Sequence, residues 1–270
     1  MSFSAKAGFI GTGNMGGALA TAVAKKIGGE NVFLADLCKD KAGQLAANIG
    51  ANVSDNRKTA ECCDYIFLGV KPQMMADMLS EIQDILRSRK NEILLVSMAA
   101  GLSTEKICAM AGIELPVVRI MPNTPVSVGC GVVLYCANSL VTETQCRMVA
   151  AMLSEAGYVD SIDEKLIDAA SAVSGCGPAF VYIFAESLAD GAVACGLPRA
   201  KAIAYAAKMI EGSAKLLFES GKHPGELKDN VCSPGGSTIQ GVKALEDGGF
   251  RGDVMEAVAA AYKKTVNLGK

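Results

Sequence analysis

Close to its start the sequence reads Gly8-Phe9-Ile10-Gly11-Thr12-Gly13-Asn14-Met15-Gly16-Gly17, which contains the pattern GxGxxG at Gly11, Gly13 and Gly16. An apolar run precedes the pattern and a helical stretch follows it. In such a strand–turn–helix unit the first glycine permits a tight turn, the second lets a pyrophosphate approach the backbone, and the third lets the helix pack on the strand. Free N–H groups at the positive helix end then hold the phosphates. The pattern therefore predicts a dinucleotide site at Gly11–Gly16.

Apolar runs alternate with helical stretches from this point to about Asp160, and this alternation predicts a doubly wound, mostly parallel α/β sheet with helices on both faces. The predicted strands are Ala7–Ile10, Asn31–Ala35, Tyr65–Val70, Ile93–Ser97 and Val117–Ile120, and the predicted helices between them are Asn14–Lys26, Lys39–Asn48, Gln73–Ser88 and Thr104–Met110. Val132–Tyr135 and Tyr158–Ile162 extend the sheet and flank a helix near Glu143–Ser154. We assign residues 1–162 to a Rossmann-like domain.

Residues 163–270 show only helical patterns, so we predict an all-helical second domain. One helix begins at Pro198 and runs to about Ser220. Its charged residues share one narrow stripe, and its other faces carry apolar side chains or glycine; the charged set is Lys201, Lys208, Glu211, Lys215 and Glu219. A helix that is apolar over most of its circumference must be covered on several sides. In a domain of this size we expect a second subunit to supply the cover.

Composition excludes several classes of partner. Lys and Arg total 26 against 28 for Asp and Glu, a formal charge of −2, and Trp is absent. The charge balance shows no footprint for nucleic acid or an anionic membrane, and few aromatic residues are present for base stacking. The uncharged stretch from Ile120 to Thr142 contains Pro122, Pro125 and glycines that would break a helix in lipid.

Ten cysteines occur without zinc-ligand spacing, so no metal site is predicted. A chain of this size does not need disulfides, which favours reduced thiols. The N-terminus runs directly into a strand pattern and leaves no room for a signal peptide. We therefore expect a soluble, cytoplasmic protein.

Asp36, just after the second predicted strand, has two interpretations. As the acid that accepts from the adenosine ribose hydroxyls it would favour NADH and repel the 2′-phosphate of NADPH. As an N-cap it would only start the following helix. Lys39 and Lys41 lie close by and could neutralise a phosphate, so the choice of cofactor stays open. Val70-Lys71-Pro72 and Ser97-Met98-Ala99-Ala100-Gly101 also follow strands and should face the cofactor crevice.

A second candidate site lies in Gly235-Gly236-Ser237-Thr238, a glycine turn before a predicted helix. Exposed N–H groups and two hydroxyls would suit a small carboxylate, although Ser237 or Thr238 could equally be an ordinary helix cap. His223, the only histidine, is expected to be a hydrogen-bonded residue at a helix start. A ketone substrate would need stronger acid–base help than the chain offers, which points towards reduction of a C=N bond.

The sequence resembles the pyrroline-5-carboxylate reductase family over nearly its whole length. The motifs that carry the resemblance are GFIGTGNMGG (8–17), GVKP (69–72), MPNTP (121–125), SGCGPA (174–179) and HPGELKDNVCSPGGST (223–238). The resemblance implies reduction of L-1-pyrroline-5-carboxylate to L-proline, the last step of proline biosynthesis, with NADPH named first and NADH as the alternative. It also implies a helical dimerisation domain and a homodimer, with dimers that often assemble into decamers.

Site residues follow from the resemblance position by position. It implies that Gly11–Gly16, Asn56, Lys71, Pro72, Ser97, Ala99 and Asn230 line the cofactor. It implies that Ser237 and Thr238 hold the substrate carboxylate with Glu164 nearby, and that Ser174 matches a common serine of the family. Gly236 joins this substrate set as part of the glycine cradle, and Thr238 is our hypothesis for a catalytic proton donor. Cys176 stands where many members have serine, which puts any role of that hydroxyl in doubt.

Two other functions remain as alternatives. A β-hydroxyacid dehydrogenase would carry a lysine soon after the glycine run near Gly177, where this chain continues Pro178-Ala179-Phe180-Val181-Tyr182. A non-catalytic NAD(P)-sensing dimer fits the fold, but it has no need for a second cradle of carboxylate size.

Overall fold

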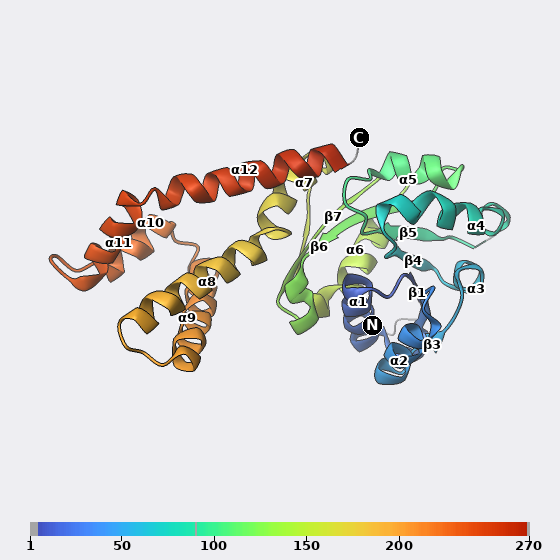
Figure 1. Cartoon of the computed structure of the whole chain (residues 1–270). Helices are drawn as coiled ribbons and strands as arrows, with labels where there is room; N and C mark the ends of the chain where they lie inside the picture. Colours follow the sequence, from blue (N-terminus) through green and yellow to red (C-terminus); the bar gives the residue numbers. More distant parts are fainter. Residues whose placement is uncertain (1–4, 90, 269–270) are drawn as a thin grey trace. The chain divides into compact units, whose positions relative to one another are not determined.

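The computed structural model describes residues 5–89 and 91–268 (Figure 1). They form two compact units. The sheet unit comprises the described residues up to Cys176 together with those from Ala261 onward, and the helical unit comprises Gly177–Ala260.

The sheet unit is built on eight strands in the order β3-β2-β1-β4-β5-β6-β7-β8. The strands are β1 (Ala7–Ile10), β2 (Val32–Ala35), β3 (Asn52–Val53), β4 (Tyr65–Leu68), β5 (Leu94–Ser97), β6 (Val117–Pro122), β7 (Gly131–Ala137) and β8 (Gly157–Ser161). Every neighbouring pair is parallel except β6 and β7. The predicted doubly wound, mostly parallel sheet is confirmed, and the uncharged stretch 120–142 folds as strand, short 3₁₀ turn and strand.

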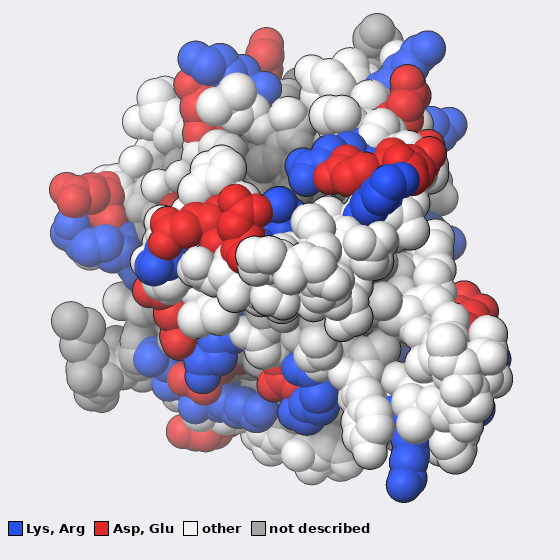
Figure 2. Space-filling view, turned by 90° about the vertical axis from the view of Figure 1, so that its left-hand side faces the viewer, with Lys and Arg blue, Asp and Glu red and all other residues white. Residues whose placement is uncertain are grey.

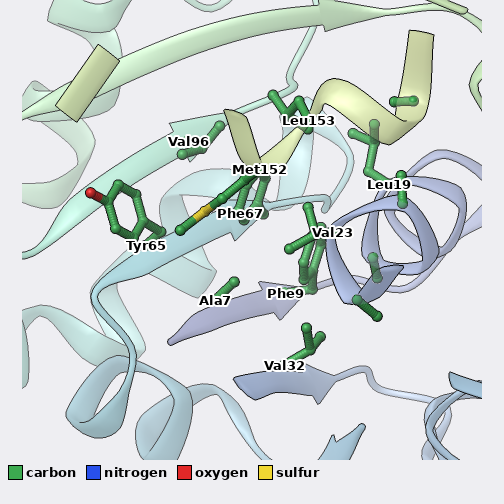
Figure 3. Close-up of a cluster of buried hydrophobic side chains, with 14 of the residues drawn as sticks. Ala7, Phe9, Leu19, Val23, Val32, Tyr65, Phe67, Val96, Met152 and Leu153 are labelled. Atoms are coloured by element: carbon green, nitrogen blue, oxygen red, sulfur yellow. The ribbon is translucent and has the colours of Figure 1, made fainter. Parts of the chain in front are cut away.

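Helices cover both faces of this sheet. The helices are α1 (Asn14–Ile27), α2 (Lys39–Ile49), α3 (Asn56–Cys62), α4 (Met75–Ser88), α5 (Thr104–Ala111), α6 (Glu143–Met152) and α7 (Glu164–Ser174). One apolar core packs α1, α2 and α6 on the sheet, and a second core packs α3, α4 and α5. In the first core Phe9 stacks on Phe67 with ring centroids 4.4 Å apart, beside Leu19, Val23 and Met152 (Figure 3).

Sequence patterns missed β3 and α3. Strand β3 has only two residues, and α3 carries mostly polar side chains, so neither produces a clear apolar period. The one local signal is Asp55, whose carboxylate accepts from the N–H of Lys58 as the N-cap of α3.

Helix α7 belongs to the sheet unit. The domain boundary predicted at residue 162 follows the last strand, whereas the compact unit continues to Cys176. Ile167 on α7 is fully buried, and Asp168 pairs with Arg119 of β6. The stretch Glu164–Ala194 is long and apolar enough by composition to span a membrane. Its first part, α7, nevertheless packs on the sheet, and a turn after Ser174 separates α7 from the next helix.

The helical unit consists of α8 (Gly177–Ala194), α9 (Arg199–Ser220), α10 (Pro224–Val231), α11 (Ser237–Asp247) and the first part of α12 (Phe250–Leu268). Only Ala189, Ala202 and Ala206 are buried in this unit. Large apolar side chains are exposed along α8 and α9, among them Ile183, Tyr205, Met209 and Leu216. Figure 2 shows basic and acidic side chains intermingled, with broad uncharged areas between them. As in the sequence-based expectation, this unit lacks cover for its apolar faces.

Candidate functional site

The glycine-rich turn between β1 and α1 has the geometry that a bound pyrophosphate requires. Gly11 has φ +98°, and a Cβ added there would lie 2.6 Å from the carbonyl carbon of Gly69. A Cβ on Gly16 would lie 2.2 Å from the carbonyl oxygen of Gly11. A Cβ on Gly13 would meet nothing within 4 Å. Gly11 and Gly16 therefore serve close backbone packing, while Gly13 leaves open space at the surface of the turn.

The start of α1 presents unpaired amides at this open space. Gly13 is the N-cap and has no side-chain cap, and the amide of Gly17 donates to the carbonyl of Gly13 at 2.8 Å. The amides of Asn14, Met15 and Gly16 precede that first bond, so they have no partner within the helix. Amides at a positive helix end favour a phosphate, and the residues present fit a dinucleotide.

Asp36 contacts the glycine-rich turn directly. Its Oδ2 accepts from the backbone N–H of Thr12 at 2.7 Å and from the Thr12 hydroxyl at 2.9 Å, and its Oδ1 accepts from the N–H of Cys38 at 2.9 Å. Burial of the carboxyl opposes ionisation, but the hydrogen bonds from Cys38 and Thr12 and the charge of Lys41 outweigh it, so the pKa of Asp36 lies below its ordinary value. The N-cap interpretation of Asp36 is wrong, because the N-cap of α2 is Cys38.

A hollow of about 290 Å³ lies beside the start of α1. Thr12, Asn14, Lys25 and Lys41 are among the residues that line it. Lys39 and Lys41 are exposed in the first turn of α2 and form no ion pair within the described residues. Positive charge is therefore available next to the glycine-rich turn.

The other predicted cofactor residues of the sheet unit follow the carboxyl ends of parallel strands, as the turn and Asp36 do. Asn56 begins α3 after β3, and Lys71 and Pro72 are exposed after β4. Ser97 ends β5 and is buried, with its hydroxyl accepting from the amide of Ala99 at 3.4 Å. The structure thus brings five of the predicted segments to one edge of the sheet. Asn56 also donates to Glu81 Oε2 at 2.7 Å, which orients its amide.

The predicted substrate residues Glu164 and Ser174 lie at the two ends of α7. Glu164 accepts at 2.8 Å from both the amide and the hydroxyl of Thr104, through its two carboxylate oxygens. The Ser174 hydroxyl donates to the carbonyl of Ala170 at 3.1 Å. Both side chains are therefore engaged within the sheet unit in this structure.

Sequence reasoning missed two side chains that fix α7. Arg119 on β6 is 3% exposed, and its Nη2 lies 2.6 Å from Asp168 Oδ1. Asn123 donates from Nδ2 to the carbonyl of Ser174 at 2.9 Å and accepts on Oδ1 from the amide of Val132 at 2.8 Å. A lone charge inside the apolar run of β6 was the available signal for Arg119. Opposite Arg119, burial together with the charge of Glu164 raises the pKa of Cys136 to about 12.

The second candidate turn lies in the helical unit. Gly235 has φ +70°, and Gly236 is the N-cap of α11 without a side-chain cap. The helix-cap interpretation of Ser237 and Thr238 is therefore wrong, since both are helical residues after the cap. Their hydroxyls have no protein partner among the hydrogen bonds of the described residues. The turn consequently offers open amides and open hydroxyls, as a carboxylate cradle requires.

Asn230 and His223 belong to α10, which precedes this turn. Asn230 is exposed in the last turn of that helix. His223 is its N-cap, and its Nδ1 accepts from the amide of Gly225 at 3.1 Å. The predicted role of His223 at a helix start is confirmed.

Comparison with known proteins agrees with this arrangement. The family description "Pyrroline-5-carboxylate reductase dimerisation" matches residues 164–268, and "NADP oxidoreductase coenzyme F420-dependent" matches residues 6–101. The chain is 39% identical to pyrroline-5-carboxylate reductase of Escherichia coli (strain K12) over 98% of both chains. The chain belongs to the pyrroline-5-carboxylate reductase family. The predicted family membership is confirmed.

Solved structures of relatives share the whole fold. The crystal structure of Plasmodium falciparum pyrroline carboxylate reductase with NADP bound is 38% identical, with a TM-score of 0.88 over 99% of each chain. The structure from Coxiella burnetii is 30% identical, with a TM-score of 0.91 over 99% of this chain and 100% of that one. The predicted fold, a Rossmann-like domain followed by a helical dimerisation domain, is confirmed.

Proposed function

We propose that this chain reduces L-1-pyrroline-5-carboxylate to L-proline with NADPH, the last step of proline biosynthesis. The observation that carries the proposal is a pair of open anion cradles, at Gly11–Gly16 and at Gly235–Thr238. Membership of the family supports the reaction, and the relative solved with NADP supports the cofactor. NADH is the alternative donor.

NADPH would be held at the carboxyl edge of the sheet, where its hydride supplies the reducing equivalent. The amides at the start of α1 would bind the pyrophosphate, and Gly13 leaves room for its approach. The remaining residues of this proposed site are Asp36, Asn56, Lys71, Pro72, Ser97, Ala99 and, from the helical unit, Asn230. The buried Ser97 and Ala99 would exclude water from the reacting end.

The substrate carboxylate would bind the amides and hydroxyls of Ser237 and Thr238, beside Gly236, whose own amide donates to the Ser233 carbonyl at 3.0 Å. This grip would orient the imine carbon, C2 of the pyrroline ring, towards the hydride donor. Bound NADPH would supply the hydride for this carbon. The C=N π electrons would pass to the nitrogen, which enters protonated as the iminium and would become the amine of proline. The Thr238 hydroxyl would donate a hydrogen bond to the substrate. Glu164 and Ser174 complete the proposed substrate set, and Glu164 would have to share its carboxylate with Thr104.

The chain would act as a homodimer in the cytoplasm, with dimers assembling into a decamer. The exposed apolar faces of α8 and α9 support the dimer, as does the match to a dimerisation family over residues 164–268. The ten cysteines, all within the described residues, are free thiols, which suits a reducing compartment.

The test is a spectrophotometric assay of the pure protein with pyrroline-5-carboxylate and either NADPH or NADH. We expect dinucleotide oxidation that depends on the substrate, faster with NADPH, with proline as the product. Binding of the dinucleotide without turnover would instead identify a sensor, and turnover without proline would refute the proposed substrate.

A further inference from the structure

The carboxylate of Asp36 accepts hydrogen bonds from groups of the protein itself. Three N–H or O–H groups donate to it, two from Thr12 and one from Cys38, at 2.7 to 2.9 Å. Thr12 is only 1% exposed, so its hydroxyl is oriented by this contact and not by solvent. An ionised carboxylate offers about four lone-pair directions, and three are already used. A paired grip on both hydroxyls of an adenosine ribose is therefore not available.

The same contacts join the two loops that follow β1 and β2. Besides the two bonds from Thr12 to Asp36, the amide of Gly11 donates to the carbonyl of Ala35 at 2.8 Å. Three hydrogen bonds thus fix the first half of the glycine-rich turn against the end of β2. The conformation of Gly11, with φ +98°, is held by this connection on one side and by Gly69 on the other.

Lysines predominate among the charged residues next to this connection, where Glu155 also lines the hollow. Lys39 and Lys41 stand in the first turn of α2 without an ion pair within the described residues, and Lys41 is close enough to lower the pKa of Asp36. Asp40 is the acidic residue in the same turn. Two lysines at the N-terminus of an eleven-residue helix favour an added phosphate over a neutral hydroxyl.

We propose that Asp36 is a positioning residue for the glycine-rich turn, and that Lys39 and Lys41 discriminate NADPH from NADH. The inference rests on the proposed function only in placing a dinucleotide at this turn. Asp36 contributes to the affinity for both dinucleotides equally, because it shapes the pyrophosphate cradle that they share. The lysines contribute only where a 2′-phosphate is present.

Calorimetric titration of NADP⁺ and NAD⁺ into the full-length protein, without substrate, tests this inference. For Asp36→Asn we expect both Kd values to rise by about tenfold, with their ratio unchanged within about threefold. Thr12→Val, which removes the hydroxyl but keeps the backbone amide, should raise both Kd values in the same proportion. For Lys39→Gln combined with Lys41→Gln we expect about a tenfold loss for NADP⁺ and none for NAD⁺. Lys26→Gln, in the last turn of α1 and outside the lining of the hollow, is the matched control and should change neither Kd.

If Asp36→Asn bound NADP⁺ more tightly relative to NAD⁺ than the unmodified protein does, Asp36 would contact the ribose directly. That result would overturn the inference. Unchanged Kd values in Asp36→Asn, or unchanged NADP⁺ affinity in the lysine variant, would overturn it as well. If Asp36→Asn does not fold, Thr12→Val and the lysine variant decide the matter. Failure of the unmodified protein to bind either dinucleotide would refute the proposed function itself. If the unmodified protein binds and only the Kd changes in the variants differ from those expected, only this inference is refuted.

Discussion

The two compact units differ in how completely they bury their own apolar side chains. The sheet unit encloses two cores, and its largest apolar side chains, such as Phe9, Phe67 and Leu79, have no exposed surface. The helical unit buries three alanines and exposes large side chains along α8 and α9. Because burial of apolar area is the main stabilising contribution, the sheet unit supplies its own stability. The helical unit leaves apolar faces uncovered, and in the proposed homodimer a second copy would supply the cover. Changes in the two units should therefore have different consequences.

The strongest test of this comparison is to place charge on the exposed apolar face of α9. Tyr205 and Met209 are one helical turn apart on that face. In Tyr205→Glu combined with Met209→Glu we expect loss of the dimer and at least about a hundredfold loss of reductase activity, since buried unpaired carboxylates are strongly unfavourable. NADP⁺ affinity should stay within about threefold, because the sheet unit is complete without a partner. Light scattering after gel filtration and calorimetric titration measure the two effects.

The matched control is Lys201→Glu, on the charged stripe of the same helix, which should leave the dimer intact. A double variant that remains dimeric would show that this face is not the interface. Loss of NADP⁺ binding together with the dimer would contradict the independence of the sheet unit.

The next test concerns Thr238 of the helical unit, which differs from Thr12 of the sheet unit in its hydrogen bonding. Thr238 in α11 has no hydrogen-bond partner among the described residues, while Thr12 is buried and bonded to Asp36. Thr238→Ala should therefore lower kcat/KM by roughly 10- to 100-fold, as expected for loss of a hydrogen bond to a charged ligand. The melting temperature should not change. An unchanged kcat/KM would remove Thr238 from the mechanism, and Thr144→Ala, on the exposed face of α6, controls for the assay.

Sequence predicted most of the sheet unit because its signals are local. The motif from Gly8 to Gly17 fixes β1 and the start of α1, and the predicted strands there match within one or two residues. The mostly polar sequence of α3 shows no regular spacing of apolar residues, so this helix was not predicted. The contact between Thr12 and Asp36 joins residues 24 positions apart. Nothing in the sequence indicates that this carboxylate will accept its hydrogen bonds from the glycine-rich turn. For the same reason Asn123, which joins Val132 to Ser174, was not predicted as a structural residue.

A pair of glycine substitutions tests whether the turn serves the fold or the ligand. Gly13→Ala meets no protein atom within 4 Å, so the melting temperature should stay unchanged while the methyl group obstructs the phosphates. We expect about a tenfold rise of Kd for both dinucleotides. Gly11→Ala, by contrast, would strain a residue with φ +98° against Gly69 and destabilise the sheet unit by about 1–3 kcal/mol. Calorimetric titration and thermal unfolding separate the two, and a destabilised Gly13→Ala would show that this position serves the fold.

The smallest effect should come from the pH dependence of the sheet unit. The pKa of Asp36 is lowered in the folded protein below its ordinary value of 3.8, because hydrogen bonds and Lys41 outweigh its burial. Its stabilisation is therefore complete above that value and is lost as the pH falls through the folded pKa. Asp36→Asn should lose about 1 kcal/mol of unfolding free energy at pH 7, and the difference from the unmodified protein should shrink below pH 4. Asp84→Asn is the control, since Asp84 also has a lowered pKa but pairs with Arg57 at an exposed site, where solvent screens the charges. Urea unfolding at several pH values measures both variants, and a difference that persists unchanged at low pH would mean that the Asp36 carboxylate is not the source of the stabilisation.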